Sequence, residues 1–174
     1  RSPAEYNGPA NWAMPVESHG LPTVKLPAGM TRSSAGEKEA LRRWEEFRVG
    51  ALADYKLNRD RADLDGTSRL STHLKWGEIH PRTLLQYLGD SAGEETFRKE
   101  LAWREFYADV LFHNPRTVTE YLNPVFAEME YDTGVIADER FEAWKSGNTG
   151  YPFVDAGMRQ LLAEGWMHNR VRMV

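Results

Sequence analysis

The sequence predicts an all-α fold for residues 37–174, preceded by an extended linker at residues 1–36. Apolar residues recur at helical spacing along most of the second segment. No stretch alternates between apolar and polar residues as a half-buried strand does. The first 36 residues are instead rich in Pro, Gly and Ser, without sustained periodicity. We therefore expect an interdomain linker followed by part of one helical domain.

Residues that favour helix ends bound the periodic segments. Ser34 is a candidate N-cap of the first helix, Pro81 suits a first turn, and Gly147 and Gly165 suit helix C-termini. Between helices, residues 60–69 form a polar loop and residues 113–137 are turn-rich. The predicted helices cover about 34–52, 70–77, 81–89 and 94–112, a short segment with Phe141 and Trp144, and 152–164, and a last one begins near Trp166.

Composition limits the classes of function. The chain has 174 residues, 41% of them hydrophobic and 28% charged, which is a globular balance. It has no cysteine, which excludes disulfides and thiolate metal sites and fits a reducing compartment. Its net charge of −4 argues mildly against nucleic acid, but a local groove decides phosphate affinity. No apolar run has the length of a membrane span, and no signal peptide is visible.

The ends of the sequence and its histidines lead to two further expectations. The chain begins without methionine and stops inside a patterned segment, so we expect a fragment that is inactive on its own. No metal site is expected, because the histidines and carboxylates form no recognisable set of ligands: His73, His80, His113 and His168.

The first candidate motif is Gly66-Thr67-Ser68-Arg69-Leu70-Ser71. A glycine turn with three hydroxyl groups and an arginine, leading into a helix, can donate hydrogen bonds to phosphate. A plain helix cap explains the same residues, because Ser and Thr are favoured there, and spacing alone favours the cap.

The second motif lies on the helix at residues 94–112, where four residues share one face: Glu100, Trp103, Arg104 and Tyr107. A carboxylate, two aromatic rings and a guanidinium together could contact a base edge, stack on it and hold a phosphate. The alternative is an ordinary Glu100–Arg104 ion pair, with the aromatic rings in the core.

The third motif is Gly165-Trp166-Met167-His168-Asn169-Arg170-Val171-Arg172-Met173. Polar donors beside soft apolar atoms suit a planar ligand, although such residues are more often a solvated helix end.

The three motifs occur together with further residues between the second and the third: Trp144, Thr149-Gly150-Tyr151-Pro152 and Val154-Asp155-Ala156-Gly157-Met158-Arg159-Gln160-Leu161. In this order and with these residues, the sequence resembles the DNA photolyase/cryptochrome family from about residue 37 onward. The closing motif is most similar to class I cyclobutane-pyrimidine-dimer photolyases. The resemblance implies the N-terminal part of a helical domain that binds FAD and receives a flipped pyrimidine dimer. It also implies light-driven repair of damaged DNA by electron transfer from reduced FAD, as a monomer, in a bacterial-type cytoplasm and without a membrane.

The resemblance also implies roles for individual residues. It places Glu100 and Asn169 in catalysis. Cofactor binding falls to Tyr55, Thr67, Ser68, Arg69, Leu70, Ser71, Phe97, Glu100, Arg104, Trp166, His168, Asn169 and Arg172. Contacts with DNA or the dimer fall to Arg59, Glu100, Trp103, Arg104, Asn169, Arg170 and Met173.

The sequence departs from the family pattern in two ways, and one alternative function within the family stays open. The family's antenna domain, with its folate or deazaflavin chromophore, and the C-terminal half of the FAD domain are missing. Gly134 stands where the outermost tryptophan of the electron relay is expected, and Tyr131 replaces it only with a three-residue insertion. A cryptochrome, which is a flavin photoreceptor without repair activity, is the alternative, and Asn169, Arg170 and Met173 speak against it.

Overall fold

The computed structural model describes residues 25–31 and 33–174 of the chain. Most of the predicted linker at residues 1–36 therefore lies outside the described residues. Within the described part every regular element is helical and no strand occurs, which confirms the predicted all-α class. None of the described helices is long and apolar enough to cross a membrane.

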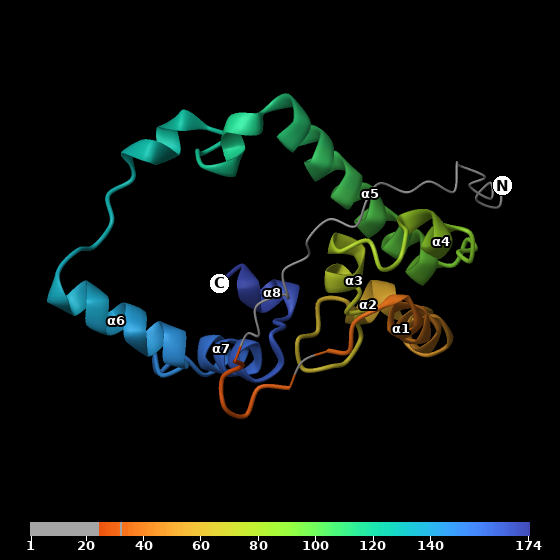
Figure 1. Cartoon of the computed structure of the whole chain (residues 1–174), viewed down its shortest axis with the longest axis horizontal. Helices are drawn as coiled ribbons and strands as arrows, with labels where there is room; N and C mark the ends of the chain where they lie inside the picture. The colour runs from red at the N-terminus through yellow and green to blue at the C-terminus, as the bar shows by residue number, and fades with distance from the viewer. Residues whose placement is uncertain (1–24, 32) are drawn as a thin grey trace, which may run out of the picture.

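The described helices follow one another in a chain that turns back on itself (Figure 1). The group α1 to α5 lies together, the far end of α5 leads away from it, and the chain returns through α6 and α7. This return brings α8 and the C-terminus back beside the first group. The elements are α1 (Glu37–Val49), α2 (Tyr55–Asn58), α3 (Ser71–Lys75), α4 (Pro81–Leu85), α5 (Ala92–His113), the 3₁₀ turns η1 (Pro115–Val118) and η2 (Pro124–Glu128), α6 (Val135–Ser146), α7 (Pro152–Glu164) and α8 (Asn169–Arg172).

Two predicted helix starts are wrong. The first helix begins at Glu37 after Gly36, whose φ of 101° is a conformation that favours glycine, so Ser34 is not its cap. The last helix begins at Asn169 rather than near Trp166. The buried side chain of His168 caps it, because His168 Nδ1 accepts a hydrogen bond from the backbone N–H of Arg170 at 3.1 Å.

An aromatic cluster joins α1, α2 and the first half of α5. The ring of Phe97 lies 5.7 Å from that of Trp44, 5.1 Å from that of Phe47 and 5.5 Å from that of Tyr55. Ser91 and Glu94 form a reciprocal capping box that starts α5. A side chain at position 93 would place its Cβ 2.0 Å from the backbone oxygen of Leu52, so only glycine lets α5 start against this turn. The cluster fixes α2 and its end against α5.

The C-terminal helices are tied both to each other and to the first group. Gly157 of α7 allows α8 to approach closely, since a Cβ there would lie 2.2 Å from a methyl carbon of Val171. The backbone N–H of Thr31 donates to the carbonyl of Ala163 at 2.8 Å, which connects the start of the described chain to the end of α7. Together with ion pairs from Arg69 to Glu164 and from Arg170 to Asp60, these contacts hold residues 166–172 near the loop at residues 66–71.

Candidate functional site

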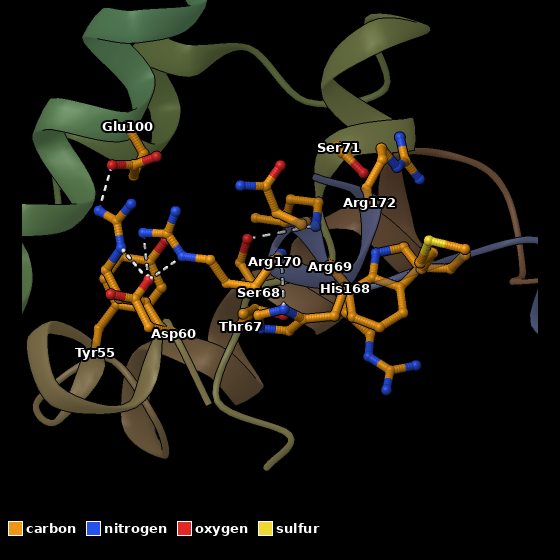
Figure 2. Close-up of a pocket in the computed structure, with 15 residues that line it drawn as sticks. Tyr55, Asp60, Thr67, Ser68, Arg69, Ser71, Glu100, His168, Arg170 and Arg172 are labelled. Carbon is orange, nitrogen blue, oxygen red and sulfur yellow. Dashed lines mark hydrogen bonds and ion pairs between the residues drawn. The ribbon is translucent and has the colours of Figure 1, made fainter. Parts of the chain in front are cut away.

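One pocket of about 280 Å³ collects residues from three distant parts of the chain (Figure 2). They come from the end of α2 and the loop before α3, from Glu100 on α5, and from the segment that leads into α8. The lining residues are Tyr55, Arg59, Asp60, Thr67, Ser68, Arg69, Leu70, Ser71, Glu100, Trp166, Met167, His168, Asn169, Arg170 and Arg172. Each of the three predicted motifs contributes residues to the lining of this pocket.

The loop at residues 67–71 is anchored to the core by the side chain of its leucine, Leu70. Leu70 is buried and packs in the core cluster with the aromatic rings, although it also touches the pocket, and the side chains of Thr67, Ser68 and Ser71 line the pocket beside it. Ser68 Oγ accepts a hydrogen bond from the backbone N–H of Leu70 at 3.4 Å, which stiffens the turn. Three hydroxyl groups therefore stand at one wall of the pocket on a backbone that the core holds in place.

Arg69 supports this loop from the side. Its φ is +51°, the only positive value at a non-glycine position among the described residues, so surrounding contacts must hold the backbone there. Its guanidinium lies 3.0 Å from Asp65 Oδ1 and 2.8 Å from Glu164 Oε2, and 4.2 Å from the ring centroid of Trp166. Arg69 thus uses Nε for its own loop and Nη1 for α7, while it also lines the pocket. Its predicted role in cofactor binding stays a prediction.

Glu100 does not pair with Arg104, so the ordinary ion pair within α5 is wrong. Arg104 pairs instead with Glu105 at 2.6 Å and lines a separate cavity. Glu100 forms its ion pair with Arg59, which α2 carries to the side of α5. Packing of these two helices offers Glu100 a partner that the spacing along one helix cannot reveal.

The ion pairs continue from Arg59 across the mouth of the pocket. Asp60 Oδ1 lies 3.4 Å from Arg59 Nε and 2.7 Å from Arg170 Nη2 (Figure 2). The hydrogen bond from Arg170 lowers the pKa of Asp60 below its usual range. Two arginines and two carboxylates therefore alternate in charge from Glu100 to Arg170.

Tyr55 connects this charged row to the aromatic core. Burial of its ring, with a smaller effect of the nearby Glu100 charge, raises the pKa of the phenol to about 12. A tyrosine hydroxyl is protonated at neutral pH even without this shift, so that of Tyr55, which lines the pocket, can donate a hydrogen bond there.

His168, directly before α8, is buried and lines the pocket. Because its Nδ1 accepts from the backbone of Arg170, the neutral ring carries its proton on Nε2. Nε2 is buried and has no hydrogen-bond partner among the described residues. A buried donor without a partner costs about 1–3 kcal/mol, so this wall favours a ligand with an acceptor.

Four predicted site residues lie outside the pocket lining. Phe97 is buried in the core, where its ring supports that of Tyr55. Trp103 is 52% exposed and lies with Phe106 and Tyr107 in a row of aromatic rings on α5. Arg104 lines the second cavity, and Met173 is exposed with its sulfur 3.9 Å from Arg170 Nη1. The roles assigned to these four stay predictions.

Two pocket residues, Asp60 and Met167, were not predicted. Asp60 follows Arg59 directly, but its stronger partner lies 110 residues further along the chain, so no local pattern marks it. At the expected relay position, Gly134 is the N-cap of α6 with a φ of 89°, a conformation that favours glycine. The hydroxyl of Tyr131 instead hydrogen-bonds that of Tyr121.

Comparison with known proteins finds one matching protein family, and the similar proteins carry names that agree with it. Residues 97–174 match the family described as the FAD binding domain of DNA photolyase. A deoxyribodipyrimidine photo-lyase of Alkalihalophilus pseudofirmus is 42% identical over 146 residues, which cover 82% of this chain and 30% of that protein. Cryptochrome-1 of Arabidopsis thaliana is 36% identical over 141 residues, covering 74% of this chain and 20% of that protein.

A solved structure agrees with these matches. The crystal structure of a bacterial class III photolyase from Agrobacterium tumefaciens has a TM-score of 0.73 and 41% identity, covering 79% of this chain and 29% of that one. The chain thus spans about a third of the length of the curated relatives it matches, or less.

Proposed function

Because the chain belongs to the DNA photolyase/cryptochrome family, we propose that it forms part of the FAD- and DNA-binding domain of a deoxyribodipyrimidine photo-lyase. In this proposal the whole protein splits pyrimidine dimers in DNA with light, in the compartment that contains the DNA. The observation that carries the proposal is the single pocket in which the hydroxyl loop, Glu100 and the closing motif meet.

The residues of the pocket fit the polar part of FAD. The hydroxyls of Thr67, Ser68 and Ser71 and the guanidinium of Arg172 are donors of the kind that bind phosphate. The unpartnered N–H of His168 adds a donor for a further acceptor on the cofactor. A volume of 280 Å³ lies at the lower limit of cofactor pockets, about 300–1,000 Å³, which suits part of the molecule rather than all of it.

The chemistry of dimer splitting belongs to the cofactor, since reduced FAD, when bound, supplies the light-driven electron that opens the cyclobutane ring. The protein's residues position the dimer and stabilise the charge that it gains. Glu100 hydrogen-bonds the polar edge of the dimer, and the amide of Asn169 supports it from the opposite wall. Trp103, exposed on the next turn of α5, offers a ring on which the flipped base can stack.

DNA binding requires cations beside this pocket in a chain of negative net charge. Arg59 and Arg170 are the arginines at its mouth, with side chains 23% and 37% exposed. Both can therefore reach solvent, and phosphate contacts from this position would set the register of the damaged strand over the pocket.

A photoreceptor without repair activity is the second candidate, favoured by the match to Cryptochrome-1. Asn169 and Arg170, which line the pocket, and Met173 beside it favour repair instead. The class of photolyase stays a prediction: the closing motif resembles class I, whereas the solved relative is of class III.

Photorepair by the full-length protein tests the proposal. The protein, loaded with FAD and reduced, is illuminated with a duplex that carries one thymine dimer, and the intact thymines are counted. We expect light-dependent repair with no repair in the dark. Bound FAD without repair would support the photoreceptor, and absence of FAD binding would contradict both candidates.

A further inference from the structure

Asp60 lies between the two arginines at the mouth of the pocket and has no role in the function proposed above. One of its oxygens, Oδ1, accepts a hydrogen bond from Arg170 Nε at 2.8 Å and lies 2.7 Å from Arg170 Nη2. The same oxygen lies 3.4 Å from Arg59 Nε (Figure 2). A single carboxylate oxygen therefore sets where both guanidinium groups stand.

The charge of Asp60 allows the two arginines to lie this close. Two guanidinium groups that reach the same atom repel each other, and the carboxylate between them offsets that repulsion. Glu100 pairs with Arg59 from the other side, so the row of four side chains has no net charge. Asp60 is ionised at neutral pH, as an aspartate ordinarily is, and the hydrogen bond from Arg170 lowers its pKa further.

Each arginine still has donors to offer an outside anion. Arg59 uses Nε and Nη1 for the two carboxylates, and Arg170 uses Nε and Nη2 for Asp60. Arg59 Nη2 and Arg170 Nη1 make no hydrogen bond to an oxygen within the described part of the chain. A guanidinium has five N–H groups in a fixed plane, so holding one edge aims the other.

We propose that Asp60 is a positioning residue for recognition of damaged DNA, which holds Arg59 and Arg170 as a pair against the phosphate backbone beside the pocket. This inference rests on the proposed function. Non-specific binding depends on the sum of charges, which Asp60 lowers, whereas a flipped nucleotide requires the backbone at one place relative to the pocket. Loss of Asp60 should therefore reduce the preference for damaged DNA without reducing affinity for undamaged DNA.

The test measures the affinity of full-length, FAD-loaded protein for a duplex with one thymine dimer and for the same undamaged duplex. Asp60→Asn is compared with Asp63→Asn, which makes the same change of charge three residues away. Asp63 is a matched control because it is exposed, pairs with Arg61 in the same loop and does not line the pocket. FAD content and unfolding temperature are recorded for each variant.

We expect Asp60→Asn to lower the ratio of the affinity for damaged duplex to that for undamaged duplex by about three- to tenfold, because two partly exposed ion pairs are lost. Asp63→Asn should leave the ratio unchanged. Arg170→Lys, which keeps the charge but loses the planar group, should lower the ratio as well. When Arg59→Gln and Arg170→Gln are already present, Asp60→Asn should change nothing further.

Two results would overturn the inference. One is an unchanged ratio in Asp60→Asn, which includes an equal fall of both affinities. The other is a fall in the ratio on Asp60→Asn that persists when the two arginines are already replaced. A wild-type protein with no preference for the dimer would remove the proposed function and this inference together. A wild-type preference that Asp60→Asn leaves intact would remove only the role of Asp60.

Discussion

Arg69 and Glu164 join the loop at residues 67–71 to the end of α7, with Arg69 Nη1 2.8 Å from Glu164 Oε2. This pair ties the pocket's loop at residues 67–71 to the end of α7, 95 residues further along the chain. Since the backbone at Arg69 has a positive φ, its side-chain contacts also hold a conformation that the loop would otherwise leave. The placement of the three hydroxyl groups thus depends on residues that need not touch the ligand.

Glu164→Gln should weaken FAD binding by the full-length protein about two- to fivefold, because it removes one partly exposed ion pair of about 0.4–1 kcal/mol. Titration of FAD against the apoprotein measures the change. Glu142→Gln is the control, since Glu142 also pairs with a cation, Lys145, but lies on α6 away from the pocket. Equal affinities of both variants and the wild type would mean that Arg69 does not need Glu164 to hold the loop.

His168 has two functions in the structure, and two substitutions separate them. Asparagine can still cap α8 but lacks the N–H at Nε2, whereas alanine lacks both. We expect His168→Asn and His168→Ala to have the same affinity for FAD, about tenfold lower than that of the wild type, since each loses one buried hydrogen bond. The alanine variant should unfold about 1 kcal/mol more easily than the asparagine variant. Wild-type affinity in His168→Asn would show that Nε2 has no acceptor on the cofactor.

Asp155 should make the stability of the α6–α7 region depend on pH. Its carboxylate accepts hydrogen bonds from the hydroxyl and backbone N–H of Thr149 and from the N–H of Gly150, and these lower its pKa from 3.8. A carboxyl group with a lowered pKa in the folded state stabilises it above the unfolded value and loses that effect as pH falls through the folded value.

Asp155→Asn should consequently lower the unfolding temperature at pH 7, and the difference from wild type should shrink below about pH 4. Thermal unfolding at a series of pH values measures it. A difference that stays constant down to the acid unfolding of the wild type would assign the effect to shape rather than to charge.

Arg59→Ala should flatten the salt dependence of DNA binding. Loss of one phosphate contact lowers the slope of log affinity against log salt concentration by about 0.9. Arg61→Ala is the matched control, because Arg61 is two residues away, pairs with Asp63 and does not line the pocket. Equal slopes for the two variants would show that Arg59 makes no phosphate contact and would leave it with its ion pairs to Glu100 and Asp60.

The sequence predicts the parts of this site better than the contacts between them. The helical class and the three motifs follow from local spacing, because periodicity and turn residues are local properties. The ion pair between Asp60 and Arg170 cannot be read in this way, since its partners meet only after α7 returns to the first helices. His168 as a helix cap is a local contact, with the backbone N–H of Arg170, and it is missed for a different reason: the predicted helix begins too early, near Trp166, so His168 counts as part of it.

Glu100 gave two predictions from sequence, a pair with Arg104 or a carboxylate of the pocket, and packing of α2 against α5 decides between them. Arg59 reaches Glu100 because both helices share the aromatic cluster of Phe47, Tyr55 and Phe97. Spacing along α5 allows both partners, so only the tertiary structure distinguishes them. The role of Glu100 in repair is the prediction on which the function depends most.

The most direct test is the number of dimers repaired per absorbed photon by the full-length protein, measured for wild type, Glu100→Ala and Glu105→Ala at equal FAD content. Glu105 is the control because it lies on the same helix, pairs with Arg104 and is exposed. We expect light-dependent repair by wild type, an unchanged yield in Glu105→Ala, and a yield lower by about tenfold or more in Glu100→Ala, since a charge-assisted hydrogen bond to the dimer is lost. Wild-type yield in Glu100→Ala, or no repair by the wild type, would contradict a pocket built for dimer repair.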